Sequence, residues 1–202
     1  VVNASPLAVV NGANYQAGVL PSDSLASAFG ENLALGTEAA AALPLPTELA
    51  GTTVTVNGVP ASLLYVSPTQ INFIAPSNLD TGTATIIVSN ANGSYAMGTS
   101  QVAAVAPAIF TADATGRGDA AALATIDGFK YVPQPFDLTV NGKPNILVLF
   151  GTGIRNAAAP NPTDNNGVAE AMRVTIDGLE ANILYAGAQG QFIGLDQINV
   201  EF

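Results

Sequence analysis

Apolar and polar residues alternate in short runs along this chain, with turn-forming pairs between the runs. Val54 and Val56 alternate with Thr53 and Thr55. A period of two predicts half-buried β-strands. The run from residue 146 to residue 150 is apolar at every position, which predicts a strand covered on both faces.

Five Asn-Gly or Asp-Gly pairs mark the turns between these runs. Such pairs supply the two positive φ angles of a type I′ turn, which joins adjacent antiparallel strands. Only Glu38 to Leu43 favours a helical turn, and Pro44 and Pro46 end it. The chain is therefore predicted to be all-β and built of sandwiches. The five pairs are Asn57-Gly58, Asn92-Gly93, Asp127-Gly128, Asn141-Gly142 and Asp177-Gly178.

Three separated segments occur twice, which predicts two homologous β units. Seven additional residues in the second copy fall in a longer loop, Gly187 to Asp196. With a boundary near residues 105 to 107, the expected domains are an N-terminal extension (1–8), a first sandwich (9–105) and a second sandwich (106–202). The matching segments are 54–65 with 174–185, 29–30 with 150–151, and 70–72 with 197–199, at offsets of 120, 121 and 127 residues.

The two copies differ after the shared Gln-Ile-Asn. The first continues into a strand-like run, the turn pair Asn92-Gly93 and a second run, which predicts a hairpin. The second has only Val200, Glu201 and Phe202 beyond Asn199. We therefore expect the second sandwich to lack its closing hairpin and to leave strand-edge N–H and C=O groups unpaired.

The segments NGANYQAGVLPSDSLASAFGENLA, TVTVNGVPASLLYVSPTQINFIAP, VAPAIFTADATGRGDAAALATIDG, ILVLFGTGI and VTIDGLEANILYAG occur in this order. Over roughly residues 9 to 202 the chain resembles the C-terminal β-domain family of secreted Solibacter-type (acidobacterial) proteins. The FGENLA and VNGVPA segments are also similar to immunoglobulin-like IPT/TIG domains. The resemblance implies export, tandem immunoglobulin-like sandwiches and no established catalytic residues. The family usually adds a strand pair after the second Gln-Ile-Asn, and this sequence departs from that pattern.

Three arrangements complete an unfinished sandwich: the first copy covers it, it forms a smaller sandwich, or another chain inserts a strand. The N-terminal segment is a candidate donor, since apolar residues alternate along it and Pro6 is tolerable at an edge. The alternative is that it forms the first strand of the first copy, or a linker. A donor from the next copy gives a head-to-tail homopolymer. Candidate contacts are Val1, Val2, Ala4, Leu7 and Val9 on the donor side, and Gln197, Ile198, Val200 and Phe202 on the acceptor side.

Composition limits the partners. Five Lys and Arg stand against fifteen Asp and Glu, for a net charge of −10, so nucleic acid and anionic lipid are poor partners. No uninterrupted apolar run of about 18 residues predicts a membrane span. We expect an extracellular or cell-surface protein whose signal peptide has been removed.

The absence of cysteine and histidine excludes thiolate chemistry and a histidine base. No catalytic, cofactor or metal residue is assigned. The aspartates have the neighbours of turn residues, and the alternative of Ca²⁺ ligation rests on segments 113–119 and 164–166. Gly151-Thr-Gly153 lacks the third glycine of a dinucleotide site and predicts a strand-end turn.

Two further features bear on recognition. Arg117-Gly118-Asp119 spells a cell-adhesion tripeptide, although the aspartate is also explained by a turn. Tyr15, Tyr95, Phe129 and Tyr131 lie near turns and offer a stacking surface for sugars, or pack within the protein. The sequence thus favours a non-catalytic filament subunit joined by β-strand complementation. The alternative is an adhesive or glycan-binding module of a larger secreted protein.

Overall fold

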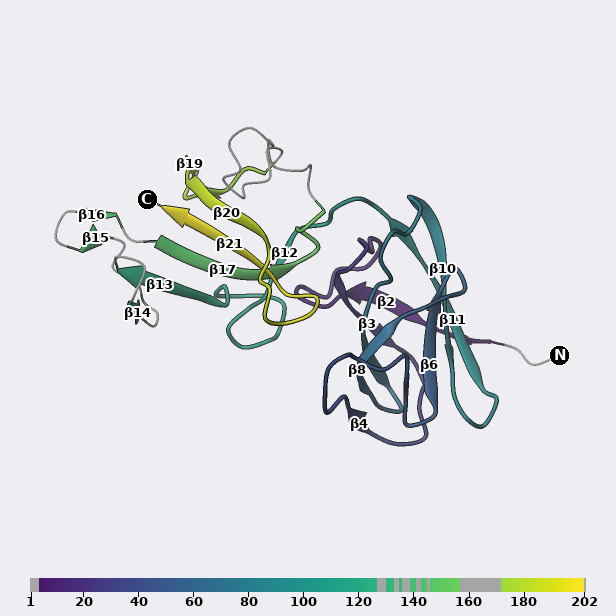
Figure 1. Ribbon diagram of the computed structural model, residues 1–202. Coiled ribbons are helices and arrows are strands. Elements are labelled where there is room, and N and C mark those ends of the chain that lie inside the picture. The colour runs from purple at the N-terminus through teal and green to yellow at the C-terminus, as the bar shows by residue number, and fades with distance from the viewer. Residues whose placement is uncertain are drawn as a thin grey trace. The chain divides into compact units, whose positions relative to one another are not determined.

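The computed structural model describes residues 4–126, 130–132, 135, 139–140, 143–144, 146–156 and 172–201. Every regular element in these ranges is a strand, so the all-β prediction is confirmed (Figure 1). The chain divides into two compact units, Val1–Ala106 and Pro107–Phe202. No helix within the described ranges is long and apolar enough to cross a membrane.

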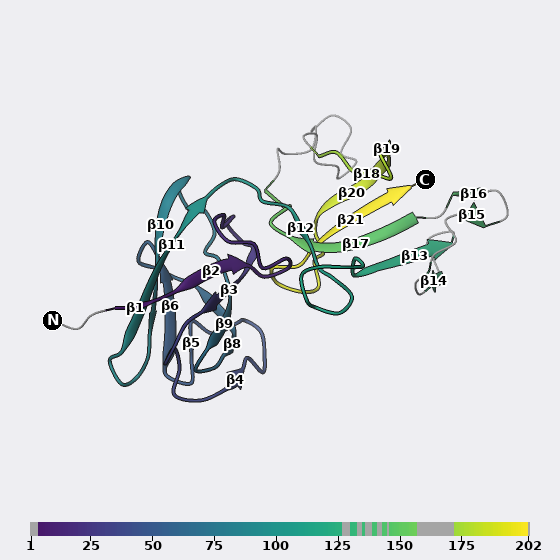
Figure 2. The same ribbon diagram turned by 180° about the vertical axis from the view of Figure 1, so that it is seen from behind.

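The first unit contains two sheets. One is antiparallel throughout and has five strands. Their spatial order is β2 (Ala8–Asn11), β3 (Leu25–Phe29), β9 (Gln70–Ile74), β8 (Ser62–Val66) and β4 (Glu38–Ala39). Figure 2 shows β2, β3, β9 and β8 from behind.

The other sheet of the first unit has six strands and contains the hairpin predicted after the first Gln-Ile-Asn. That hairpin is β10 with β11, and β10 also pairs with β6. The spatial order is β1 (Ser5–Pro6), β11 (Tyr95–Val102), β10 (Gly82–Ser89), β6 (Thr52–Val56) and β5 (Glu48–Leu49), with β7 (Val59–Pro60) also on β6.

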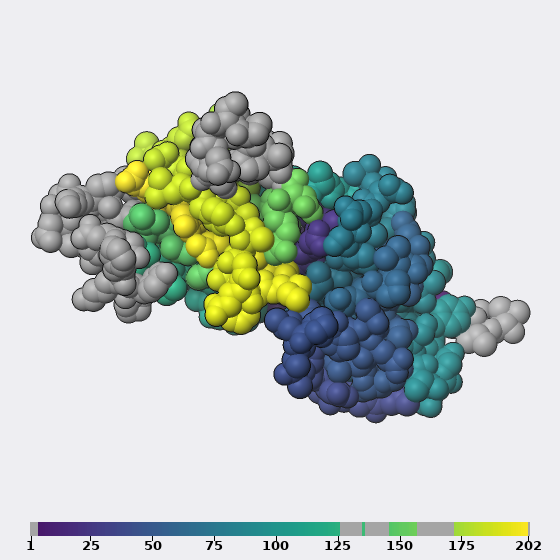
Figure 3. All heavy atoms as spheres, in the orientation of Figure 1, coloured from purple at the N-terminus to yellow at the C-terminus, as the bar shows by residue number. Residues whose placement is uncertain are grey.

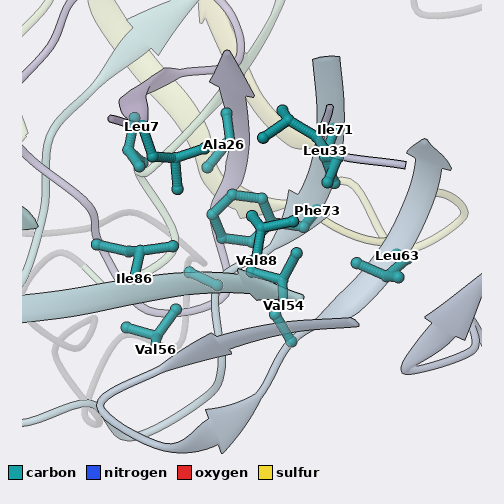
Figure 4. Packing of buried hydrophobic residues seen from close by; sticks show 14 of the residues in the cluster. Leu7, Ala26, Leu33, Val54, Val56, Leu63, Ile71, Phe73, Ile86 and Val88 are labelled. Atoms are coloured by element: carbon teal, nitrogen blue, oxygen red, sulfur yellow. The ribbon is translucent and has the colours of Figure 1, made fainter. Parts of the chain in front are cut away.

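The alternating residues of both sheets form one hydrophobic core. Phe73 of β9 is fully buried, and in Figure 4 its ring lies among Ala26 and Leu7 from one side and Val54 and Val88 from the other. The run Thr52–Val56 buries every second residue, as its alternation predicts. The valines at 54 and 56 are 0% exposed, so this part of the core is closed to solvent.

The described part of the N-terminal segment pairs and packs within the first unit. Ser5 and Pro6 pair in parallel with β11, and the Leu7 N–H donates to the Met97 carbonyl at 3.1 Å. Leu7 and Val9 are only 8% and 6% exposed in the core. The segment thus contributes to both sheets of the first unit, since Ser5 and Pro6 pair with β11 and Ala8–Asn11 pairs with β3.

The second unit has one large sheet of six strands. Its spatial order is β14 (Lys130–Val132), β13 (Ala122–Ile126), β17 (Ile146–Thr152), β21 (Asp196–Glu201) and β20 (Asn182–Ala188), with β12 (Ala108–Ile109) also on β17. The second unit also has two short two-stranded ribbons, whose described residues do not pair with the large sheet and whose strands are labelled in Figure 2. They are β15 (Thr139–Val140) with β16 (Lys143–Pro144), and β18 (Thr175–Ile176) with β19 (Leu179–Glu180).

The repeat in sequence is a repeat in register. Phe29 pairs with Gln70 in the first unit, and Phe150 pairs with Gln197 in the second. Both copies also have a β-bulge at the same place, between Leu63 and Tyr65 in β8 and between the equivalent residues 183 and 185 in β20. The Gln-Ile-Asn motif has a structural reason, because the glutamine Nε2 donates to the asparagine Oδ1 in each copy, at 2.9 and 2.8 Å.

Two local predictions need correction. Glu38 and Ala39 form an edge strand against β8 rather than a helical turn, since their backbone gains pairing with Val66 and Tyr65 there. Asn92-Gly93 is not a type I′ turn: only the glycine has positive φ, because the Asn90 side chain accepts a hydrogen bond from the Asn92 N–H in a longer loop.

Two of the predicted type I′ turns are confirmed, Asn57-Gly58 and Asp177-Gly178, in which both residues have positive φ. The other two pairs, at 127–128 and 141–142, lie outside the described residues.

Replacing Phe73 with alanine should lower the free energy of unfolding of the first unit by about 3–5 kcal/mol, because it leaves a cavity in a closed core. The control is Phe192→Ala, at a side chain that is 62% exposed in the second unit. It should change the free energy of unfolding of that unit by less than about 0.5 kcal/mol. Urea denaturation followed by circular dichroism measures both. Equal effects would contradict this description of the core.

Candidate functional site: the edge of β18

The ribbon β18–β19 is the second copy of β6–β7. Asn57 and Asp177 both have φ of 50°, and the following glycines have φ of 81° and 78°. The Ala61 N–H donates to the Val54 carbonyl at 2.9 Å, and the Ala181 N–H donates to the Val174 carbonyl at 3.0 Å. The two hairpins therefore have the same backbone geometry.

The two hairpins differ on their other edge. In the first unit β10 pairs with β6 along four residues, from Ile86 opposite Val56 to Ser89 opposite Thr53. In the part of the second unit that the structure describes, β18 pairs only with β19. The ribbon thus lacks a described partner at the position that the β10–β11 hairpin fills in the first unit.

Backbone groups along this edge point away from β19. In an antiparallel strand successive residues direct their N–H and C=O groups to opposite sides. The Val174 carbonyl bonds to Ala181, on the β19 side. Thr175 therefore directs its N–H and C=O groups away from β19. Asp177 directs its N–H to the same side, as the equivalent Asn57 does when its N–H donates to the Thr85 carbonyl. Such an edge is a template for another strand.

The core reflects the same difference. Val54 and Val56 are fully buried, whereas their equivalents Val174 and Ile176 are partly exposed. The second core consists of Leu147, Ile154, Ala181, Ala186, Ile198 and Val200, with Met172, Val174, Ile176 and Ile183 among the partly buried residues packed against it. An added strand would therefore bury apolar surface as well as form hydrogen bonds.

The acceptor residues predicted from the sequence are not at this edge. Ile198 and Val200 are buried in the second core, and Gln197 bonds to Asn199 on the same strand. Their strand, β21, has β17 on one side and β20 on the other, so it offers no free edge. The prediction named the strand that ends the repeat, whereas the edge without a partner among the described residues is that of β18. Phe202 lies outside the described residues.

The donor residues predicted from the sequence do not form one exposed strand in the described residues. Val1 and Val2 lie outside the described residues, Ala4 is partly buried, and Leu7 and Val9 belong to the first core. The residues that sequence reasoning missed are Val174, Ile176 and Asp177. These three residues match residues 54, 56 and 57 at an offset of 120, and this match could have pointed to them. However, that residues 54 and 56 pair with β10 is known only from the sheet order of the structure.

A second feature of this unit is a loop held by a buried carboxylate. Asp196 is 0% exposed; it accepts hydrogen bonds from the Ile154 and Arg155 N–H groups, at 2.7 and 3.2 Å, and from Arg155 Nε, at 2.6 Å. The Thr152 hydroxyl donates to the Gly194 carbonyl at 2.8 Å. These bonds fix the longer loop of the second copy, which ends at β21 and lies at the surface (Figure 3). It presents Phe192 and Ile193, which are 62% and 44% exposed.

Loop 111–120 contains the predicted adhesion tripeptide and the first Ca²⁺ candidate. Arg117 and Asp119 are exposed at its tip. The Thr115 N–H and hydroxyl donate to Asp113 Oδ1, at 3.1 and 2.9 Å, and these bonds lower the pKa of Asp113 below its ordinary 3.8. Their stabilisation is therefore complete above about pH 3.8 and is lost as the pH falls through the folded-state pKa. This is the turn chemistry predicted for the aspartates.

The remaining candidates find little support. Within the described ranges no three Asp or Glu side chains gather as metal ligands would, and segment 164–166 lies outside those ranges. Tyr15, 39% exposed, packs edge-on against Phe29 with ring centroids 6.2 Å apart. Tyr95 is partly buried, and the Phe129 and Tyr131 side chains are outside the described set. Gly153, with φ of 76°, ends β17 in a turn as predicted.

Comparisons with known proteins add no identity. No family model matches the chain, and no curated protein matches it. Among solved structures the chain is similar to an auxiliary nutrient binding protein from Bacteroides ovatus, at 13% identity and a TM-score of 0.32. The alignment covers 54% of this chain and 23% of that chain. At this TM-score the likeness carries no argument about function, so the Solibacter-type resemblance stays a prediction.

Asp196→Ala should destabilise the second unit by about 3–5 kcal/mol, because it leaves the Arg155 guanidinium and two N–H groups without their acceptor. The control is Arg173→Ala, which breaks a 3.3 Å pair with Glu180 between side chains 75% and 69% exposed. Screening by solvent limits that loss to at most about 1 kcal/mol. Urea denaturation measures both, and a loss for Asp196→Ala no larger than the control's would refute the proposed anchoring.

Proposed function

We propose that this chain is a non-catalytic structural protein of the cell exterior whose second unit is joined to a neighbouring copy by addition of a β-strand at β18. The observation that carries the proposal is the contrast between two equivalent ribbons. The first, β6–β7, is paired with β10 and buries Val54 and Val56. The second has no described partner on that edge and leaves Val174 and Ile176 partly exposed.

Sequence features support the rest of this proposal. The lack of histidine and cysteine fits a protein without catalytic chemistry. The Lys-poor, Cys-free composition and the Solibacter-type resemblance favour export. Two sheets around one core in the first unit fit an immunoglobulin-like sandwich, and the matching registers favour the same class for the second.

Strand addition contributes favourable free energy to assembly. Each backbone hydrogen bond contributes about 0.5–1.5 kcal/mol, and burial of apolar side chains adds to it. Contact between a donor on one copy and β18 on the next is head-to-tail, so it continues into a filament unless the geometry closes it into a ring. Because Leu7 and Val9 are buried in their own unit, a donor that includes them has to give up that burial.

The second candidate function is an adhesive or glycan-binding module. The observation in its favour is the anchored loop that presents Phe192 and Ile193, since exposed aromatic side chains on rigid loops are typical contact residues. Phe192→Ala separates the two functions. It removes adhesion or glycan binding if the loop is the binding site, and leaves assembly unchanged if β18 is the contact.

Thr175→Pro tests the proposed contact directly. Thr175 is exposed and its N–H points away from β19, so proline removes a bond to the incoming strand while β18–β19 stays intact. Thr175→Val is the matched control because it keeps the N–H. By light scattering after size-exclusion chromatography, wild type and Thr175→Val should form species above 20.3 kDa, and Thr175→Pro should be monomeric.

Two results would count against the proposal. A wild-type chain that is monomeric at high concentration contradicts self-assembly. Assembly by Thr175→Pro equal to that of Thr175→Val contradicts β18 as the place of contact.

A further inference from the structure

The first unit shows how a strand is held at this position. Asn57 forms two hydrogen bonds with one residue of β10. Its N–H donates to the Thr85 carbonyl, and its Oδ1 accepts from the Thr85 N–H, both at 2.8 Å. The side chain thereby extends the ladder one residue beyond the last strand pair, Ile86 opposite Val56.

Asp177 provides the same two groups in the second unit. Its φ of 50° equals that of Asn57, and the glycine after it has the same positive φ. A carboxylate oxygen takes the place of the amide oxygen and is also an acceptor. Asp177 is exposed, and among the described residues neither its N–H nor its carboxylate has a partner.

We infer that Asp177 is a two-point clamp for the backbone of the incoming strand. The inference rests on the proposed function and specifies the chemistry of the partner. The strand runs antiparallel to β18, and its clamped residue occupies the place of Thr85. The incoming strand has apolar residues at the positions equivalent to Ile86 and Val88, which lie opposite Ile176 and Val174.

The first unit gives the reason for this pattern. Ile86 and Val88 are 0% and 1% exposed and cover the side of the core that β6 lines. Only β-branched or similar apolar side chains at alternate positions would bury the half-exposed Val174 and Ile176 in the same way. A strand with charges at those two places would bury them without partners.

A chimera presents a strand with this side-chain pattern to β18, by adding a second copy of the β10–β11 hairpin to the intact chain. Residues 73–75 of the first copy correspond to residues 200–202, so a second copy of residues 76–103 attached after Phe202 continues the repeat in register. The readout is amide hydrogen exchange of Thr175 and Asp177 measured by NMR. Both amides should exchange about tenfold or more slowly in the chimera than in the parent chain, since each gains an acceptor.

Variants of the chimera separate the clamp from general pairing. Asp177→Asn keeps an acceptor and should keep the protection. Asp177→Gly tolerates the positive φ but loses the carboxylate, and should reduce the protection of its own amide about tenfold. Asp119→Asn, an exposed aspartate in the same unit, controls for charge. Ile86→Asp with Val88→Asp in the attached copy alone should abolish the protection.

The outcomes distinguish this inference from the proposed function. Unchanged exchange at Thr175 and Asp177 in the chimera overturns the inference, even if the parent chain assembles. Equal protection in Asp177→Gly and Asp177→Asn overturns the clamp. Protection in the chimera together with a monomeric parent supports the clamp and refutes self-assembly.

Discussion

Pairing of strand edges is the constraint on which the rest of this structure depends. A strand inside a sheet needs a partner on both sides, and one with an unpaired edge remains able to bind another strand. The first unit meets the requirement at β6, which has β10 on one side and β5 and β7 on the other. The equivalent strand of the second unit has only β19 among the described residues. Val54 is buried, whereas its equivalent Val174 is partly exposed.

The local structure was largely predictable from the sequence because it depends on nearby residues. The period of two gave the strand at 52–56, and Asn57-Gly58 and Asp177-Gly178 gave two turns with positive φ. The repeated Gln-Ile-Asn correctly implied equivalent registers, since each glutamine bonds to the asparagine two residues along the same strand.

The site was less predictable because strand order depends on contacts between distant residues. The repeat shows that the hairpin at 82–102 has no counterpart before residue 202, but it does not show which strand that hairpin would pair with. The end of the repeat therefore pointed to β21, which lies inside its sheet. Similarly, alternation made the N-terminal extension, residues 1–8, a candidate donor, whereas the burial of Leu7 in the first core is a tertiary effect.

The central claim is that the outer edge of β18, which has no partner among the described residues, is open to an incoming strand. Thr55 and Thr175 are equivalent residues in one molecule, so their amide hydrogen exchange rates under the same conditions provide the most direct measurement. The account predicts slow exchange at Thr55, whose strand pairs with β10, and exchange at least tenfold faster at Thr175. Equally slow exchange at both positions in the monomer would contradict it.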